Sequence, residues 1–227
     1  RLNIVDLRAA ALYAQGHVPF ARNLPADTLR QHLRRPQALA ALLGPAGVDP
    51  AHEVVLVSDG ALTPAAALAF LAFEQLGQHK LSLLMDSVDE WGLRGHPITK
   101  AATVVGTPGA PGEPSVPAAV YPAKLRADVL LSTPSATPGV YPRVFVASGK
   151  TAAARQPAGT VVRLPYADML NADGTPKAAK DLLALITAAG VPRYAELVFF
   201  ADDPAEAAVN YVVFKLMGWP DIKVLMP

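Results

Sequence analysis

The hydrophobic pattern is most distinct in one strand, loop and helix within the first half of the chain. Four consecutive apolar residues, Val54–Val57, predict a short strand buried on both faces, as in a parallel sheet. A loop over Ser58–Thr63 leads into a helix predicted over Pro64–Leu76, with Thr63 as N-cap and Gly77 at the end. The loop therefore faces the free N–H groups of a helix, an arrangement that favours an anion or a low-pKa nucleophile.

Other segments of the first half alternate between strand and helix patterns. Gly16 is expected to end the first helix in the left-handed conformation, and Pro36 to divide a long helical pattern into two pieces. The predicted strands are Leu2–Leu7, Ala21–Pro25 with its turn and Leu81–Met85, and the predicted helices are Ala9–Gln15, the two pieces of Asp27–Leu43 and Ser87–Gly92. This alternation predicts an α/β fold with a largely parallel sheet.

The second half repeats the pattern of the first. Between the halves, residues 101–119 contain four prolines and no apolar period, which is typical of a semi-extended linker. The later predicted elements are strands at Val144–Val146, Thr160–Tyr166, Leu197–Phe200 and Ile222–Leu225, and helices within Asn171–Gly190 and over Pro204–Met217. We therefore predict two similar domains, residues 1–100 and 120–227, joined by the linker.

Composition narrows the possible functions. The chain has 20 basic and 19 acidic residues, so neither a nucleic-acid-binding surface nor a polybasic membrane surface is expected. No apolar stretch is long enough to predict a transmembrane helix. The chain has no cysteine, which eliminates disulfides, thiolate metal sites and thiol catalysis. It begins at Arg1 without Met, so we expect processing or trimming; the compartment stays open, with export slightly favoured.

Several short motifs, in their order and spacing, resemble the tandem rhodanese family of thiosulfate and mercaptopyruvate sulfurtransferases. The motifs are Asp6-x-Arg8 after the first strand, Gly16-His17-x-Pro19, Leu84 with Trp91, Gly95-x-Pro97, the segment Tyr121–Leu131, and the turn Leu170–Thr175. The resemblance covers essentially the whole chain and implies two rhodanese-like domains, each a small parallel sheet flanked by helices on both faces. It also implies that a catalytic cysteine should stand at the first loop position, where its thiolate would carry a sulfane sulfur as a persulfide.

Neither nucleophile position of this chain can provide that thiolate. Ser58 stands at the first-domain position and Ala201 at the second, where typical tandem members carry the cysteine. The vestigial first loop consists of Ser58, Asp59, Gly60, Ala61, Leu62 and Thr63. In the second, Asp203 and Glu206 are predicted to form a capping box around Pro204, which would fill the helix N-terminus with carboxylates. The second domain also has Ala147-x-Gly149 in place of Asp-x-Arg.

Other chemistry is weakly indicated. Ser58 lacks the Gly-x-Ser-x-Gly context of a hydrolase nucleophile, and we expect its hydroxyl to bond to the loop backbone. The five histidines show no paired metal spacing, so no metal or other cofactor is predicted. Asp6 and Arg8 are interpreted as a scaffold ion pair that braces the loop, rather than as a catalytic acid and its cationic partner.

The sequence thus favours an inactive pseudo-sulfurtransferase that acts as a structural or protein-binding subunit of a larger assembly. Two alternatives stay open at this point. The chain could be a cysteine-free version of an active sulfurtransferase, although cysteine replacement would not also introduce Asp202, Asp203 and Pro204. It could instead be a small-anion sensor that uses the Ser58 loop.

Overall fold

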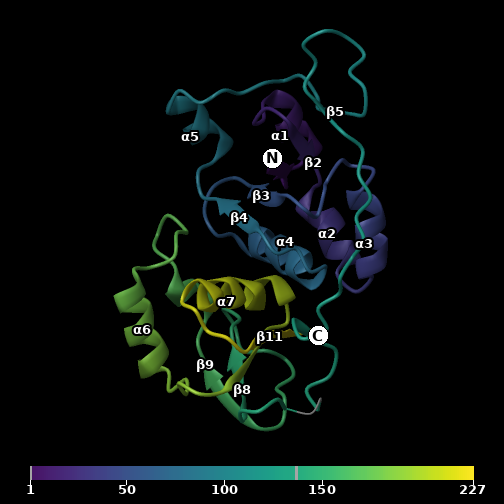
Figure 1. The fold of residues 1–227 in the computed structure, drawn as a ribbon. Coiled ribbons are helices and arrows are strands. Elements are labelled where there is room, and N and C mark those ends of the chain that lie inside the picture. The colour runs from purple at the N-terminus through teal and green to yellow at the C-terminus, as the bar shows by residue number, and fades with distance from the viewer. Residues whose placement is uncertain (1, 136–137) are drawn as a thin grey trace. The chain divides into compact units, whose positions relative to one another are not determined.

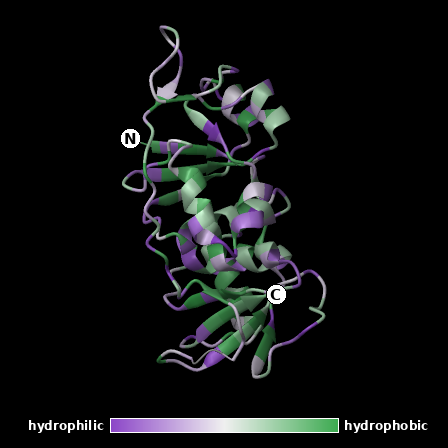
Figure 2. Cartoon of the chain, turned by 90° about the vertical axis from the view of Figure 1, so that its right-hand side faces the viewer, coloured by the Kyte–Doolittle hydropathy of each residue, from purple (hydrophilic) through white to green (hydrophobic). Residues whose placement is uncertain are grey.

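The computed structural model describes residues 2–135 and 138–227. The chain divides into two compact units, Arg1–Ala61 with Ala72–Arg126, and Leu62–Leu71 with Ala127–Pro227. The main strands form one parallel sheet of four strands and one of five (Figure 1). Figure 2 shows hydrophobic residues gathered along the strands of both sheets, as expected where helices flank a sheet.

The first sheet has the strand order β2-β1-β3-β4, and all its pairs are parallel. Its strands are β1 (Leu2–Asp6), β2 (Ala21–Asn23), β3 (Glu53–Val57) and β4 (Leu81–Leu84). The accompanying helices are α1 (Ala10–Gln15), α2 (Ala26–His32), α3 (Pro36–Leu43), α4 (Pro64–Gln75) and α5 (Val88–Leu93). These elements confirm the predicted alternation of strands and helices.

Local sequence signals explain where the helices of this part begin and end. Thr63 caps α4, because its Oγ1 accepts a hydrogen bond from the N–H of Ala66 at 3.1 Å. Pro36 divides α2 from α3 and occupies the start of α3, where its missing N–H has no cost. Gly77 follows α4 with a φ of +80°, a conformation that glycine adopts without steric strain. Ser87 begins α5 with a full capping box that we did not predict.

One prediction for the first half is wrong. Gly16 has a φ of 166°, which is extended rather than left-handed. Its small size matters instead, since an added Cβ would lie 3.1 Å from Cγ2 of Ile98. The segment 101–119 contains two short strands that the sequence did not predict, β5 (Val104–Val105) and β6 (Ser115–Val116), which pair in parallel. The side chains of Val105 and Val116 lie close to Gly47.

The second sheet has the order β7-β11-β10-β8-β9, again with parallel pairs only. Its strands are β7 (Leu130–Leu131), β8 (Arg143–Ala147), β9 (Thr160–Arg163), β10 (Glu196–Phe200) and β11 (Ile222–Leu225). The helices are the 3-10 helix η1 (Tyr166–Met169), α6 (Ala179–Ala188) and α7 (Pro204–Leu216). We did not predict the two-residue strand β7 or the 3-10 helix η1, because neither is long enough to show a hydrophobic period.

The two sheets share one topology. Four strands of the second sheet, read as β9-β8-β10-β11, match β2-β1-β3-β4 in both order and direction. In each sheet the third of these strands is followed directly by a loop and a long helix, α4 or α7. The internal repeat expected from the sequence is therefore present in the fold, and β7 extends only the second copy.

Candidate functional site: the loops after β3 and β10

Ser58 and Ala201 occupy the same place in the two sheets. Ser58 follows β3, whose last residue pairs with Asp6 at the end of β1. Ala201 follows β10, whose last residue pairs with Ala147 at the end of β8. Both residues are buried, with exposed fractions of 7% and 5%. Residues at the carboxyl ends of parallel strands are where open α/β sheets place their ligands, so the two loops are the natural candidate sites.

The first loop makes a tight turn between β3 and α4. Gly60 and Ala61 both have left-handed backbone conformations, with φ values of +82° and +66°. A Cβ on Gly60 would lie 3.0 Å from the backbone nitrogen of Ser87, so glycine is needed there for space as well as for φ. The Ala61 N–H donates to the carbonyl of Met85 at 3.1 Å. One N–H of the loop is thus already used by the protein.

The hydroxyl of Ser58 behaves differently from our expectation. We predicted a hydrogen bond to the loop backbone, but among the described residues no group is within hydrogen-bond distance of Oγ. The physical reason is that the nearby Ala61 N–H points to Met85 instead. Ser58 fills its position without being oriented or activated by a base, as a serine nucleophile would need to be.

A cavity of about 340 Å³ opens beside this loop. Its walls include Arg8, Gly16, Asp59 and Ser87. Arg8 is the cation of the cavity, but its guanidinium is bound to Asp6, and the exposed carboxylate of Asp59 adds a negative charge. The site has the shape to admit a small molecule, whereas its electrostatics are only weakly favourable to an anion.

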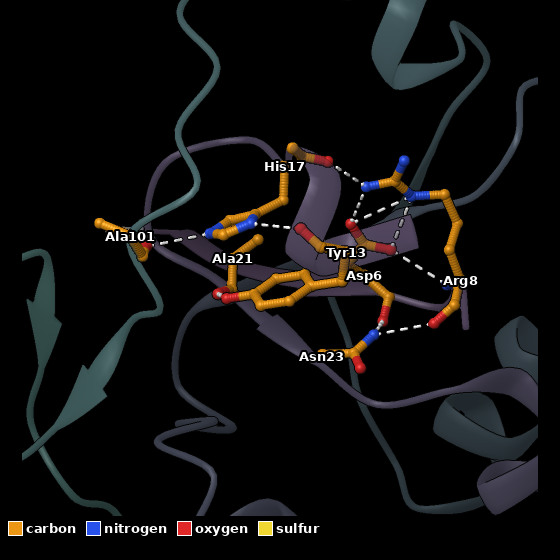
Figure 3. Close-up of polar contacts among 8 residues, drawn as sticks. Asp6, Arg8, Tyr13, His17, Ala21, Asn23 and Ala101 are labelled. Carbon is orange, nitrogen blue, oxygen red and sulfur yellow. Dashed lines mark hydrogen bonds and ion pairs between the residues drawn. The ribbon is translucent and has the colours of Figure 1, made fainter. Parts of the chain in front are cut away.

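Asp6 and Arg8 form a buried ion pair at the end of β1 (Figure 3). The Arg8 Nη2 lies 2.7 Å from Oδ2 of Asp6, and the two side chains are 9% and 0% exposed. Arg8 also donates from Nη2 to the carbonyl of Gly16 at 2.8 Å. The guanidinium thus bonds to the carboxylate of Asp6 and to the carbonyl of Gly16, and a structural role for this pair stays our prediction.

Further polar residues complete this scaffold, and the sequence did not single out two of them. Asn23 donates from Nδ2 to the carbonyls of Asp6 and Arg8, and the Tyr13 hydroxyl donates to the carbonyl of Ala21 (Figure 3). His17 is fully buried, stacks on Tyr13 at 3.7 Å, and has its ring nitrogens near the carbonyls of Tyr13 and Ala101. The spacing of four residues between Tyr13 and His17 was the one signal that could have revealed the stack.

The second loop is much shorter than the first. Only Ala201, Asp202 and Asp203 lie between β10 and α7, against six residues between β3 and α4. Asp202 accepts hydrogen bonds from the Ala154 N–H at 3.0 and 3.1 Å, and Asp203 caps α7. The loop has only three residues, and both of its carboxylates already accept hydrogen bonds from backbone N–H groups. It therefore offers no set of free N–H groups that could bind a persulfide or a substrate anion.

The cap of α7 differs from the predicted capping box. Asp203 Oδ1 accepts from the N–H of Ala205 at 2.9 Å, not from that of Glu206. Glu206 instead directs its carboxylate toward Gly149, where an added Cβ would lie 3.1 Å from Oε2. Gly149 stands where the first unit has Arg8, so a carboxylate approaches the position that a cation holds in the other copy. A cavity of about 550 Å³ beside Ala201 is lined by Asp202 as well.

Two further observations concern the part of the chain that the structure describes. No cluster of three or more metal-binding side chains occurs among these residues. No helix in the same residues combines the length and the apolar character that a membrane crossing requires.

Known proteins share this architecture. The family model of the rhodanese-like domain matches residues 1–94. SseA from Escherichia coli, a 3-mercaptopyruvate sulfotransferase of the "Rhodanese" fold, superposes with a TM-score of 0.77 at 16% identity, covering 99% of this chain and 91% of SseA. YnjE superposes with a TM-score of 0.73 at 19% identity, covering 99% of this chain and 58% of YnjE. No curated protein sequence matches the chain significantly.

A third similar structure is the anaerobic ergothioneine biosynthesis enzyme from Chlorobium limicola, with a TM-score of 0.71 at 15% identity. The superposition covers 99% of this chain and 60% of that enzyme, so the chain spans less than two thirds of this enzyme and of YnjE. The chain is thus an α/β protein with two parallel sheets in the rhodanese fold. The rhodanese-like family model matches its residues 1–94, and the chain as a whole is similar in fold to SseA.

Proposed function

We propose that this chain is a catalytically inactive rhodanese-like protein that acts as a structural or protein-binding subunit. The observation that carries the proposal is the absence of cysteine from all 227 residues of a sulfurtransferase fold. The two nucleophile positions hold Ser58, whose hydroxyl has no activating partner, and Ala201, which has no nucleophile. A serine hydroxyl has a pKa far above that of a thiol and does not replace a thiolate at neutral pH.

The second loop supports inactivity independently of the missing thiol. Asp202 and Asp203 use the N–H groups of Ala154 and Ala205, and Glu206 occupies the region beside Gly149. Restoring a thiol alone would leave these three carboxylates around it. This is the pattern expected of a site that has lost its function, and it disfavours an active enzyme whose cysteine was merely replaced.

A surface of the second unit supports the binding role. Leu183, Tyr194 and Leu216 are 51%, 72% and 70% exposed. Leu183 and Tyr194 line an open groove of about 700 Å³, together with Met217 and Trp219. Exposed large apolar side chains around one groove are typical of a protein-interaction surface.

Activity is the first test. Purified chain would be assayed for sulfur transfer from thiosulfate and from mercaptopyruvate to cyanide, with SseA from Escherichia coli as the positive control. We expect no turnover above the uncatalysed rate at any protein concentration. Turnover that rises in proportion to the chain, and that survives removal of contaminating thiols, would show that the protein is an enzyme.

The binding role has its own test. Tagged chain would be purified from its native source as wild type, as a Leu183→Asp and Tyr194→Ser double variant, and as a Leu93→Asp control. Leu93 is 88% exposed on α5 of the first unit, so this control introduces a surface charge away from the groove. We expect one stoichiometric partner with the wild type and the control, and its loss from the double variant. Native mass spectra with only the free chain in all three preparations would contradict the proposal.

A further inference from the structure

A second cavity of the first unit shares no lining residue with the cavity beside the Ser58 loop. It has a volume of about 750 Å³ and is bordered by the start of β1, by β2 and by residues 115–119. Its apolar wall includes Leu2, Phe20 and Val116, and its polar wall includes Asn3 and Arg22. We name it the Arg22 cavity, after its one buried cation.

Arg22 is buried and has no anionic partner among the residues that the structure describes. Its residue is 5% exposed, and its three hydrogen bonds go to neutral oxygens, from Nη1 to the Phe20 carbonyl and from Nη2 to Asn3 Oδ1 and the Gly47 carbonyl. The Nε–H has no partner among the described residues. A guanidinium has five N–H donors, so two of them remain unused.

The protein thus holds a positive charge in its interior without neutralising it. Burial lowers the pKa of Arg22 to about 10, which still leaves the side chain charged at neutral pH. Buried charges in proteins are ordinarily paired, because removing an unpaired charge from water is costly. Asp49 also lines this cavity, but it forms no ion pair with Arg22. Its carboxylate contacts His52 Nδ1 at 3.1 Å and accepts a hydrogen bond from the Ala51 N–H at 2.9 Å.

The surroundings hold Arg22 in place and supply an apolar surface beside it. Phe20 has a φ of +66°, an uncommon conformation for a bulky residue, and its carbonyl accepts the Nη1 bond. Its ring remains 50% exposed on the cavity wall. Val116 of β6 closes on Gly47, where an added Cβ would lie only 2.7 Å from Cγ2 of the valine. The cation therefore lies in a cavity that also offers the apolar side chains of Leu2, Phe20 and Val116.

We infer that the Arg22 cavity binds a small organic carboxylate, with the carboxylate on the unused guanidinium donors and the apolar body against Leu2, Phe20 and Val116. A carboxylate matches the planar fork of arginine and supplies the missing negative charge. The apolar wall selects against a bare inorganic anion, which would have to give up its hydration without gaining apolar contacts. This inference does not depend on the proposed loss of sulfur transfer.

The test uses benzoate as the probe, with sulfate as an anion without an apolar body and benzamide as the neutral analogue. Binding to the full chain would be followed by amide NMR titration. We expect saturable shifts at Asn3, Phe20 and Val116 with benzoate, and at least about tenfold weaker binding of sulfate and of benzamide. No saturable shift up to about 50 mM benzoate, or equal affinity for sulfate, would overturn the inference.

Three variants test whether the charge of Arg22 is responsible for benzoate binding. Arg22→Met should weaken benzoate binding at least about tenfold, while Arg193→Met, at an exposed arginine of the second unit, should leave it unchanged. If Arg22→Met fails to fold, Ala118→Glu decides, because Ala118 is exposed on the cavity lining and the new carboxylate should repel benzoate. Unchanged affinity in a folded Arg22→Met or Ala118→Glu variant, or shifts confined to residues 58–61 or 201–206, would contradict the site.

Discussion

The two sheets differ at equivalent positions on the third strand of the shared order. Glu53 at the start of β3 pairs in register with Leu2, and Glu196 at the start of β10 pairs with Arg143. Glu53 accepts one hydrogen bond from the Ser82 hydroxyl, whereas Glu196 is 1% exposed and forms ion pairs with Arg143 and Lys223. The second unit thus differs from the first around its loop and carries a buried ion network at the other end of the same strand.

The contrast teaches that the second copy keeps specifically placed polar residues in its interior, whatever the function of its loop. Asn210 of α7 is fully buried and donates to Oγ of Ser148 and to the carbonyl of Leu164, so polar residues there are placed for the fold. Arg143 bonds to Glu196 through both Nε and Nη2. These polar side chains of the second unit are bonded within the fold, and a cavity lies beside the loop of each unit.

The largest expected effect follows from this network. Glu196→Gln should lower the free energy of unfolding of the second unit by about 3 kcal/mol, because Arg143 would lose its bidentate carboxylate and Lys223 would keep only Asp221. Glu53→Gln should cost about 1 kcal/mol or less, since it removes part of one hydrogen bond. Urea unfolding followed by fluorescence resolves the two, because Trp91 lies in the first unit and Trp219 in the second.

The control for this comparison is a pair of single-tryptophan variants, Trp91→Phe and Trp219→Phe, that assign each transition. Equal losses for the glutamine variants at positions 53 and 196 would show that the ion network adds nothing to the sheet. In that case the difference between the copies would be confined to their loops.

The next effect concerns the loops themselves. A Ser58→Cys thiol would lie in a six-residue loop before a helix N-terminus, whereas an Ala201→Cys thiol would lie among Asp202, Asp203 and Glu206. The thiol pKa should therefore fall at position 58 and rise at position 201. Iodoacetamide should alkylate position 58 about tenfold faster at pH 7, a difference of about one pKa unit.

The two positions are well matched for this experiment, because Ser58 and Ala201 are 7% and 5% exposed. Full pH–rate profiles separate the thiol pKa from access, and each variant has only one cysteine, since the chain has none of its own. A lower midpoint at position 201 would refute the explanation that carboxylates disable the second loop.

Sequence reasoning reached the architecture but only part of the sites. Apolar runs such as Val54–Val57 and caps such as Thr63 are local signals, so strands and helices could be predicted within a few residues. The small sheet of β5 and β6 could not be predicted, because two-residue strands form only where the fold places a pairing strand beside them. The Nε of Arg22, which has no hydrogen-bond partner among the described residues, could not be predicted either, because its burial is known only from the structure. The side-chain direction of Asp203 toward Ala205 likewise follows from the turn and not from its spacing to Glu206.

A smaller effect should appear in the pH dependence of stability. Burial alone would raise the pKa of Glu196, but hydrogen bonds from Arg143 and Lys223 outweigh it and lower the pKa. The stabilisation is therefore present above the ordinary carboxyl pKa and is lost as pH falls through the lowered value. The second unit should therefore lose more stability than the first as the pH falls from about 5 toward 3.

The contribution of Lys223 to stability depends on pH in the opposite direction. Burial alone would lower its pKa, but hydrogen bonds to Asp221 and Glu196 raise it, so its contribution is lost only as pH rises through the raised value. Urea midpoints measured across the pH range check both limits. Glu196→Gln should abolish the excess acid sensitivity of the second unit, and an undiminished slope in that variant would place its origin elsewhere.

The weakest expected effect tests whether the first loop retains any affinity for a small oxyanion. The loop keeps six residues, the left-handed Gly60 and the N-terminus of α4, but the Ala61 N–H is used by Met85 and Arg8 by Asp6. With few free donors and the carboxylate of Asp59 opposing, sulfate should bind with a Kd of about 10 mM or weaker. Asp59→Asn should tighten binding by about threefold, whereas Asp27→Asn, a control on α2, should not. Amide shifts at residues 58–61 in an NMR titration report the binding. Shifts confined to Ala201–Glu206 would reverse the comparison, because the short acidic loop would then be the one that still recognises an anion.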